Sequence, residues 1–246
     1  MLDLDRPPQS VRQPAFNVPR VVLALLAAFV LIHAARTFFL DSDAAVWVLW
    51  NFAFIPGSYT AEAAGVDIAS LPGAGVWSFV TYALLHADWG HLIINSVALA
   101  AFASPLAFRF GAARFLAFSA IAAVAGALCT LALHWGSFAP LVGASAMVSA
   151  HMAGAARFLF LGQGRGVPSY HAHAATLRDI VTDRRTVVFL GSWLVMNLAF
   201  GLLGSGTGGT IAWEAHVGGF LVGLFLFPAF DPPVWPQTRG RRPDAA

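Results

Sequence analysis

The sequence predicts an all-α membrane protein, a bundle of six transmembrane helices with both termini cytoplasmic. Three observations carry this prediction: the composition, the length of the apolar stretches and the distribution of charge. Of the 246 residues, 58% are apolar and only 11% are charged, whereas a soluble domain carries about a quarter charged residues. We therefore expect lipid to be the main solvent of this chain.

Six apolar stretches approach the ~20 residues that an α-helix needs to cross a bilayer core. They cover residues 21–40, 77–104, 112–134, 143–161, 186–204 and 211–230. The first is long and has no small-residue cleavage site after it, so we expect a span rather than a signal peptide. The pattern predicts one six-helix membrane domain over 20–231, between cytoplasmic tails at 1–19 and 232–246.

The charged residues predict the orientation of these spans. All 14 positive charges are arginines, and those outside the spans lie in the two tails and in the second and fourth connections. The long first connection, about 41–76, carries acidic residues and no arginine. Cytoplasmic termini then place every loop arginine on the inner side, as the positive-inside rule requires. Membrane topology accounts for the basic residues, so no nucleic-acid partner is expected. Arg36 and Arg157, near span ends, are expected to extend to the lipid headgroups.

Polar side chains within the spans are the candidates for function, because ionisable groups in lipid are costly. They are His86, His91 and Asn95 in the second span, Ser145 in the fourth and His216 in the sixth. An α-helix rises ~1.5 Å per residue, which gives the height of each residue above the nearest cytoplasmic charge. Asn95, Ser145 and His216 then share one depth, roughly 10 Å below the outer boundary of a ~30 Å core.

Ser145 and His216 indicate nucleophilic catalysis. Glycine and proline precede Ser145, so we expect this residue in the first turn of its helix, where its N–H has no helical partner and the dipole favours negative charge. Ala215, Gly219 and Gly223 form a row of small residues beside His216, and such rows let helices approach closely in lipid. A serine hydroxyl could then reach the imidazole that activates it. Taken singly, these features also suit an N-cap serine and ordinary helix packing.

The second span supplies hydrogen-bond donors. His91 and Asn95 are four residues apart and share a helical face, so their donors can complete an oxyanion hole. His86 falls off this face and is expected to be a structural hydrogen-bonding residue. Its five-residue spacing from His91 does not suit a helical zinc-binding pair, so neither a metal nor a cofactor is expected. Cys129 is the only cysteine and is expected to be an inert apolar residue.

Three motifs in order along the chain resemble those of the rhomboid family of intramembrane serine proteases. HADWGHLIIN (86–95) is similar to the family's HxxxxHxxxN motif, GASA (143–146) to its GxSG motif, and AHVGGFLVG (215–223) to its AHxxGxxxG motif. Each motif is short, but the combination, in the matching spans, is specific. The resemblance covers about 20–231.

The resemblance implies a rhomboid-like bundle that hydrolyses peptide bonds in or near transmembrane segments of other membrane proteins. Ser145 would be the nucleophile and His216 its general base, a dyad that uses no cofactor. The oxyanion would be stabilised by the Ser145 N–H and by the side chains of His91 and Asn95. Gly143 would shape the turn before the nucleophile.

The chain departs from the family pattern at two places. Ala146 follows the nucleophile where the family usually has glycine, so we expect a tightened oxyanion turn. The first outer connection has Trp47 and Trp50 but lacks the arginine of the family's Trp-Arg pair. This departure concerns the anchoring of the loop.

Two other functions compete with proteolysis. A non-catalytic rhomboid-like protein that binds membrane clients would share the fold, but such proteins typically lack the serine or the histidine. A transporter would need polar groups that continue toward the cytoplasm, and the spans indicate no such path. The Ala- and Arg-rich, Lys-free composition indicates a bacterial protein of the inner (plasma) membrane. It sets no oligomeric state.

Overall fold

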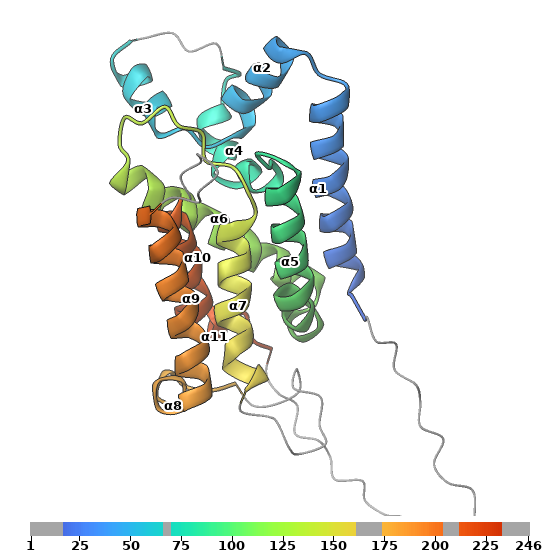
Figure 1. Cartoon of the computed structure of the whole chain (residues 1–246), viewed down its shortest axis with the longest axis vertical. Helices are drawn as coiled ribbons and strands as arrows, with labels where there is room; N and C mark the ends of the chain where they lie inside the picture. Colours follow the sequence, from blue (N-terminus) through green and yellow to red (C-terminus); the bar gives the residue numbers. More distant parts are fainter. Residues whose placement is uncertain (1–16, 66–69, 161–173, 204–211, 233–246) are drawn as a thin grey trace, which may run out of the picture.

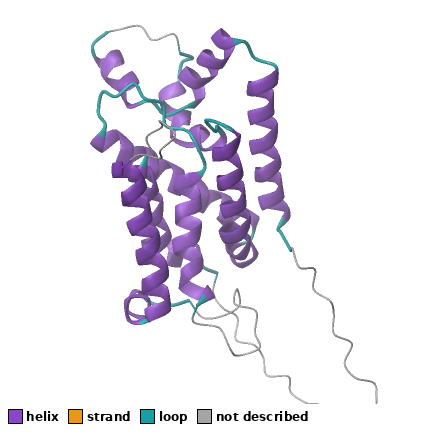
Figure 2. Cartoon of the chain, viewed as in Figure 1, coloured by secondary structure: helices purple, strands orange, loops and turns teal. Residues whose placement is uncertain are grey.

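The computed structural model describes residues 17–65, 70–160, 174–203 and 212–232. The predicted tails lie almost entirely outside these residues. The regular structure of the described part is helical (Figure 2), apart from one isolated bridge between Phe54 and Leu141. Its elements are α1 (Arg20–Phe38), α2 (Ser42–Phe52), α3 (Pro56–Ala63), α4 (Ala74–Thr81), η1 (Tyr82–Leu84), α5 (Trp89–Phe110), α6 (Ala112–Leu133), α7 (Ser145–Leu159), α8 (Leu177–Thr182), α9 (Arg184–Leu203), α10 (Trp213–Phe225) and α11 (Phe227–Phe230).

A helix lies within each of the six predicted spans. Three of the described helices, α1, α5 and α6, are long and apolar enough to cross a membrane. The helix α7 has 15 residues and α10 has 13, short of the ~20 that a complete crossing needs. The all-helical fold is confirmed, whereas six spans with cytoplasmic termini stay a prediction.

The helix α7 lies at the centre of the bundle, in contact with α5, α6 and α10 (Figure 1). Every residue from Ser149 to Phe158 is buried. Alanine and glycine occupy much of this surface, and small residues let neighbouring backbones approach a helix from several sides. The closest neighbour is α10. A methyl group at Gly219 or Gly223 would overlap the backbone carbonyl of Ala146 or Ala150, so these two glycines set the distance between α7 and α10.

The expected continuous span over 77–104 is wrong. Here the chain forms α4 and η1, and Leu85 is extended before α5 begins at Trp89. The cause is a helix start inside the apolar stretch: the Asp88 side chain caps α5 by accepting a hydrogen bond from the N–H of His91 at 2.8 Å. At its other end, α5 continues through Pro105 to Phe110. His86 therefore precedes the helix that carries His91 and Asn95.

The expectation for the two arginines near span ends is also wrong for Arg157. This residue is 5% exposed, and its guanidinium donates to the carbonyls of Ala175 and Leu224 at 2.7–3.1 Å. Arg36 donates to the carbonyl of His86 at 3.1 Å. Backbone carbonyls of other segments thus accept from Arg157 in place of lipid headgroups, and one such carbonyl accepts from Arg36.

The loop before α7 is held by contacts with the first connection. Phe54 and Leu141 exchange backbone hydrogen bonds of 3.2 and 2.8 Å, and the N–H of Gly57 donates to Ser137 at 2.7 Å. One residue before Ala144, the N–H of Gly143 donates to the carbonyl of Tyr82 at 3.0 Å. The segment that leads into Ser145 is therefore anchored at several points by α2–α3 and η1.

Candidate active site

Gly143 makes the tightest turn of the candidate site. Its φ is +116°, a conformation that side chains rarely adopt. A methyl group there would lie 2.6 Å from Cε1 and 2.7 Å from Nε2 of His91. Both the backbone conformation and the space require glycine. The turn thus brings the imidazole of His91 against the backbone two residues before Ser145.

Ser145 is the first residue of α7, as the sequence analysis expects. The N-cap position belongs to Ala144, which makes no side-chain capping bond, so Ser145 is not the N-cap serine of the alternative interpretation. The first N–H groups of a helix have no partner within it, and the positive end of the dipole lies at the same place. Ser145 is partly exposed, whereas Ala144 and Ala146 are buried.

Gly126 on α6 is the point where the neighbours of Ser145 and His216 meet. A methyl group at Gly126 would lie 2.6 Å from Cβ of Ala146 and 3.0 Å from the carbonyl oxygen of Ala215. It would also lie 2.8 Å from the Tyr82 hydroxyl, which donates to the carbonyl of Ala123 at 2.9 Å. Gly126 has no signal in the sequence, because its role depends on three other elements.

His216 is held by a residue that the sequence analysis also missed. Its Nδ1 lies 2.5 Å from Oδ1 of Asn197 on α9. Within the described residues, no hydrogen bond joins the Ser145 hydroxyl to His216. Catalytic hydrogen bonds are often long before substrate binds, so this geometry is compatible with a resting dyad.

His91 and Asn95 lie on the first turns of α5. The N–H of Ala87 points to Nδ1 of His91 across a long 3.4 Å contact. Since this nitrogen faces a donor, the ring proton belongs on Nε2, the nitrogen that faces Gly143. Asn95 is 4% exposed, and its Nδ2 donates one hydrogen to the carbonyl of His91 at 2.9 Å, which leaves its second N–H hydrogen available.

His86 does not form the side-chain hydrogen bond that the sequence analysis expects. It is fully buried, and neither ring nitrogen has a partner among the described residues. Its ring packs between Phe29 and His91, with centroids 5.0 and 5.3 Å away. His86 thus supports the position of His91 through packing.

A family model, the rhomboid domain, matches residues 73–230. This match covers more than half of the 246-residue chain and includes all three motifs. The chain belongs to the rhomboid family. No curated protein matches the sequence. Family membership and the apolar helices α1, α5 and α6 indicate an integral membrane protein.

The rhomboid chain contains a second serine–histidine pair, which lies deeper in the bundle. Ser119 Oγ and His151 Nε2 are 2.8 Å apart, and both residues are buried. The Ser119 hydroxyl already donates to the carbonyl of Phe115 at 2.8 Å, so it accepts from the imidazole and cannot be activated by it. The pair contributes packing rather than chemistry.

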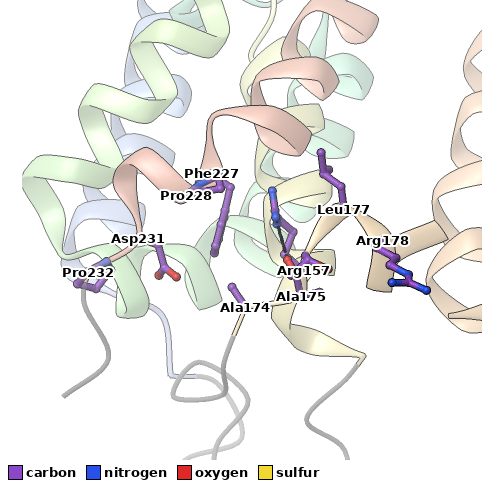
Figure 3. Close-up of a pocket in the computed structure, with 10 residues that line it drawn as sticks. Arg157, Ala174, Ala175, Leu177, Arg178, Phe227, Pro228, Asp231 and Pro232 are labelled. Carbon is purple, nitrogen blue, oxygen red and sulfur yellow. Dashed lines mark hydrogen bonds between the residues drawn. The ribbon is translucent and has the colours of Figure 1, made fainter. Parts of the chain in front are cut away.

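The rhomboid also has a cavity of about 700 Å³ beside Arg157, at the opposite end of α7 from Ser145. Figure 3 shows the residues that line it. Its lining includes Arg157, Arg178, Phe227 and Asp231. Arg157 is bonded to backbone carbonyls, and Asp231 is paired with Arg109. The cavity therefore belongs to the helix-end contacts and not to the candidate active site.

Proposed function

We propose that this rhomboid is an intramembrane serine endopeptidase that cleaves transmembrane proteins through Ser145 and His216. The observation that carries the proposal is that the residues after Ser145 and before His216 both lie against Gly126, where a methyl group would be 2.6 Å from Cβ of Ala146 and 3.0 Å from the carbonyl oxygen of Ala215. This contact brings the start of α7 to the start of α10. A nucleophile and its base must approach in this way.

In the proposed reaction, Ser145 Oγ attacks the scissile carbonyl while Nε2 of His216 takes its proton. The carbonyl oxygen becomes an oxyanion, and donors aimed at that position stabilise the transition state. The donors are the N–H of Ser145, Nε2–H of His91 and Nδ2–H of Asn95. His216 then returns the proton to the leaving amine, and a second cycle with water hydrolyses the acyl-enzyme.

The proposed substrates are transmembrane segments of other proteins. Amides within a membrane helix are hydrogen-bonded and shielded from attack, so the cleaved bond must lie where the segment unwinds. The depth count from the sequence places this position near the outer boundary of the bilayer. The proposed location is the inner membrane of a bacterium, in line with the composition.

The test is cleavage of a reporter transmembrane helix by the purified full chain in liposomes. We expect the wild-type chain to cleave the reporter. Ser145→Ala and His216→Ala should each retain less than ~1% of its activity, since the loss of either residue abolishes most of a serine dyad's catalysis. Labelling of Ser145 by a fluorophosphonate probe reports the nucleophile without any substrate. Ser192→Ala, an exposed serine on α9, is the matched control and should cleave normally.

The rival function is client binding without catalysis. It is favoured by the absence, among the described residues, of a hydrogen bond between Ser145 and His216. If this function is correct, the wild-type chain binds transmembrane reporters but neither cleaves them nor reacts with the fluorophosphonate. Cleavage that survives both substitutions would instead indicate a contaminating protease.

A further inference from the structure

Asn197 is a buried polar residue on the otherwise largely apolar helix α9. It is 7% exposed, whereas its neighbours Val195 and Met196 are exposed on the surface of the helix. Its Oδ1 lies 2.5 Å from Nδ1 of His216, and its Nδ2 donates to the carbonyl of Trp213 at 3.1 Å. Both contacts are with α10.

The hydrogen bond between Asn197 and His216 is one of several contacts that pack α9 against α10. Three contacts at four-residue intervals along α9 join it to α10: Trp193 with Phe220, Asn197 with His216, and Gly201 with Trp213. The first pair stacks with centroids 4.9 Å apart, and the third approaches so closely that a methyl group would lie 2.6 Å from Cβ of Trp213. Residues four apart share one helical face, so these contacts fix the register of α9 on α10.

The hydrogen bond to Trp213 decides which way the amide of Asn197 faces. A backbone carbonyl can only accept, so the amide atom beside Trp213 must be the nitrogen. The oxygen therefore faces His216, and an amide oxygen can only accept. The proton of a neutral His216 must then be on Nδ1, which leaves the lone pair on Nε2 free.

From this geometry we propose that Asn197 is the positioning residue for His216, so that the site contains a Ser145–His216–Asn197 triad. The inference rests on the proposed proteolytic function, in which Nε2 must accept the proton of Ser145. Asn197 would hold the tautomer that can do so and would also accept from Nδ1–H once the ring is protonated, as the buried carboxylate does in Ser-His-Asp enzymes.

The choice of an amide has a physical reason at this place. A carboxylate would be costly within a membrane protein, whereas an amide carries no charge and still presents an oxygen with a defined direction. Interhelical hydrogen bonds of asparagine also hold membrane helices together without any catalytic role. The two roles differ in what they predict for the tautomer and for kcat.

The decisive measurement is nitrogen NMR of the full chain labelled with ¹⁵N-histidine in lipid nanodiscs, with His216→Gln to assign the signal. We expect the neutral wild-type His216 to carry its proton on Nδ1. Asn197→Leu, which is close in shape and has no polar atom, should move a large share of the proton to Nε2. Asn197→Asp should retain the wild-type tautomer, because a carboxylate can only accept from Nδ1–H, and a neutral carboxyl can donate its O–H to the Trp213 carbonyl and keep its other oxygen toward Nδ1.

Kinetics of reporter cleavage provide the second readout. Asn197→Leu should lower kcat on the order of 10- to 100-fold, less than the ~10²–10⁴-fold that the whole contribution of a general base supplies, with KM changed less than about threefold. In the His216→Ala background the same substitution should have no further effect, because the two residues act as a unit. Asn197→Asp should retain much of the wild-type kcat that Asn197→Leu loses, and Ser192→Ala should behave as wild type.

An unchanged tautomer in Asn197→Leu overturns the inference, as do equal losses of kcat in the Leu and Asp variants. If Asn197→Leu does not fold, the tautomer and kcat of Asn197→Asp decide, and an Nε2–H ring in that variant overturns it. If the wild-type chain cleaves no reporter, the proposed function fails, but the NMR measurement still decides whether Asn197 sets the tautomer of His216.

Discussion

Two histidines of this rhomboid receive opposite hydrogen-bonding roles from single neighbours. Nδ1 of His91 faces the N–H of Ala87, so Nε2 carries the proton and can donate. Nδ1 of His216 faces the amide oxygen of Asn197, so Nε2 is left to accept. In the proposed mechanism one residue type thus supplies both an oxyanion donor and a general base, and the difference comes from the atoms beside Nδ1.

The turn at Gly143 leads to a prediction at this scale. Gly143→Ala should lower activity about 100- to 1,000-fold, the usual loss when one oxyanion donor is removed, because the methyl group would displace the His91 ring. The measurement is reporter cleavage in liposomes at matched protein concentration. Gly191→Ala is the control, since a methyl group on that α9 residue meets nothing within 4 Å. Normal activity in Gly143→Ala would contradict the assigned role of His91.

At the scale of elements, the contacts between helices depend on pairs of small residues. Ala146 replaces the glycine that the family usually has after the nucleophile, and its methyl group fills space that Gly126 on α6 leaves open. A glycine on another helix thus accommodates the methyl group that we expect to tighten the oxyanion turn. Gly219 meets the carbonyl of the same Ala146 from the α10 side.

This pairing predicts a compensating double substitution. Gly126→Ala should strongly reduce cleavage, because its methyl group would overlap that of Ala146 and press on Ala215. Adding Ala146→Gly should restore activity in part, since one of the overlapping groups is removed while the contacts with Tyr82 and Ala215 remain. Cleavage rates of both single variants and the double variant form the test. Strictly additive losses would show that the two positions do not interact.

At the scale of the whole molecule, a charged pair joins the ends of distant helices. Arg109, in the last turn of α5, donates from Nε and an Nη atom to the Asp231 carboxylate at 2.5 and 2.8 Å. Its guanidinium also lies over the Phe158 ring, 4.9 Å from the centroid. The pair links α5 to the residue after α11 and packs beside the last turns of α7, at the end of the bundle opposite Ser145.

Removal of this pair should destabilise the fold more than it affects the chemistry. Asp231→Ala leaves the Arg109 side chain, which is 3% exposed, without its carboxylate, and breaking such a buried pair costs roughly 3–5 kcal/mol. We expect a lower midpoint of thermal unfolding in detergent, with kcat per folded molecule unchanged. Arg178→Ala removes an exposed cation that lines the same cavity and should leave the midpoint nearly unchanged. A similar shift for both variants would contradict the role of the pair.

The sequence determined the helical fold, the family and the order of its motifs, because apolar length and motif spacing are local properties of a chain. It also placed Ser145 at the start of its helix, since Gly and Pro before it exclude an earlier turn. The continuous second span was wrong because the Asp88 cap competes with apolar length, and the position of Arg157 was wrong because its partners are carbonyls of other segments.

Only the tertiary structure decided which residues surround the candidate dyad. Nothing in the sequence distinguishes Gly126 from the other glycines, of which the chain has 23 in all. Its importance follows from the positions of Ala146, Tyr82 and Ala215 around it in the structure. Asn197 lies 19 residues from His216 in a helix without any motif, and its amide direction depends on the carbonyl of Trp213. Contacts of this kind join elements that are far apart in the chain, so their physical cause is packing in three dimensions, which spacing along one helix cannot express.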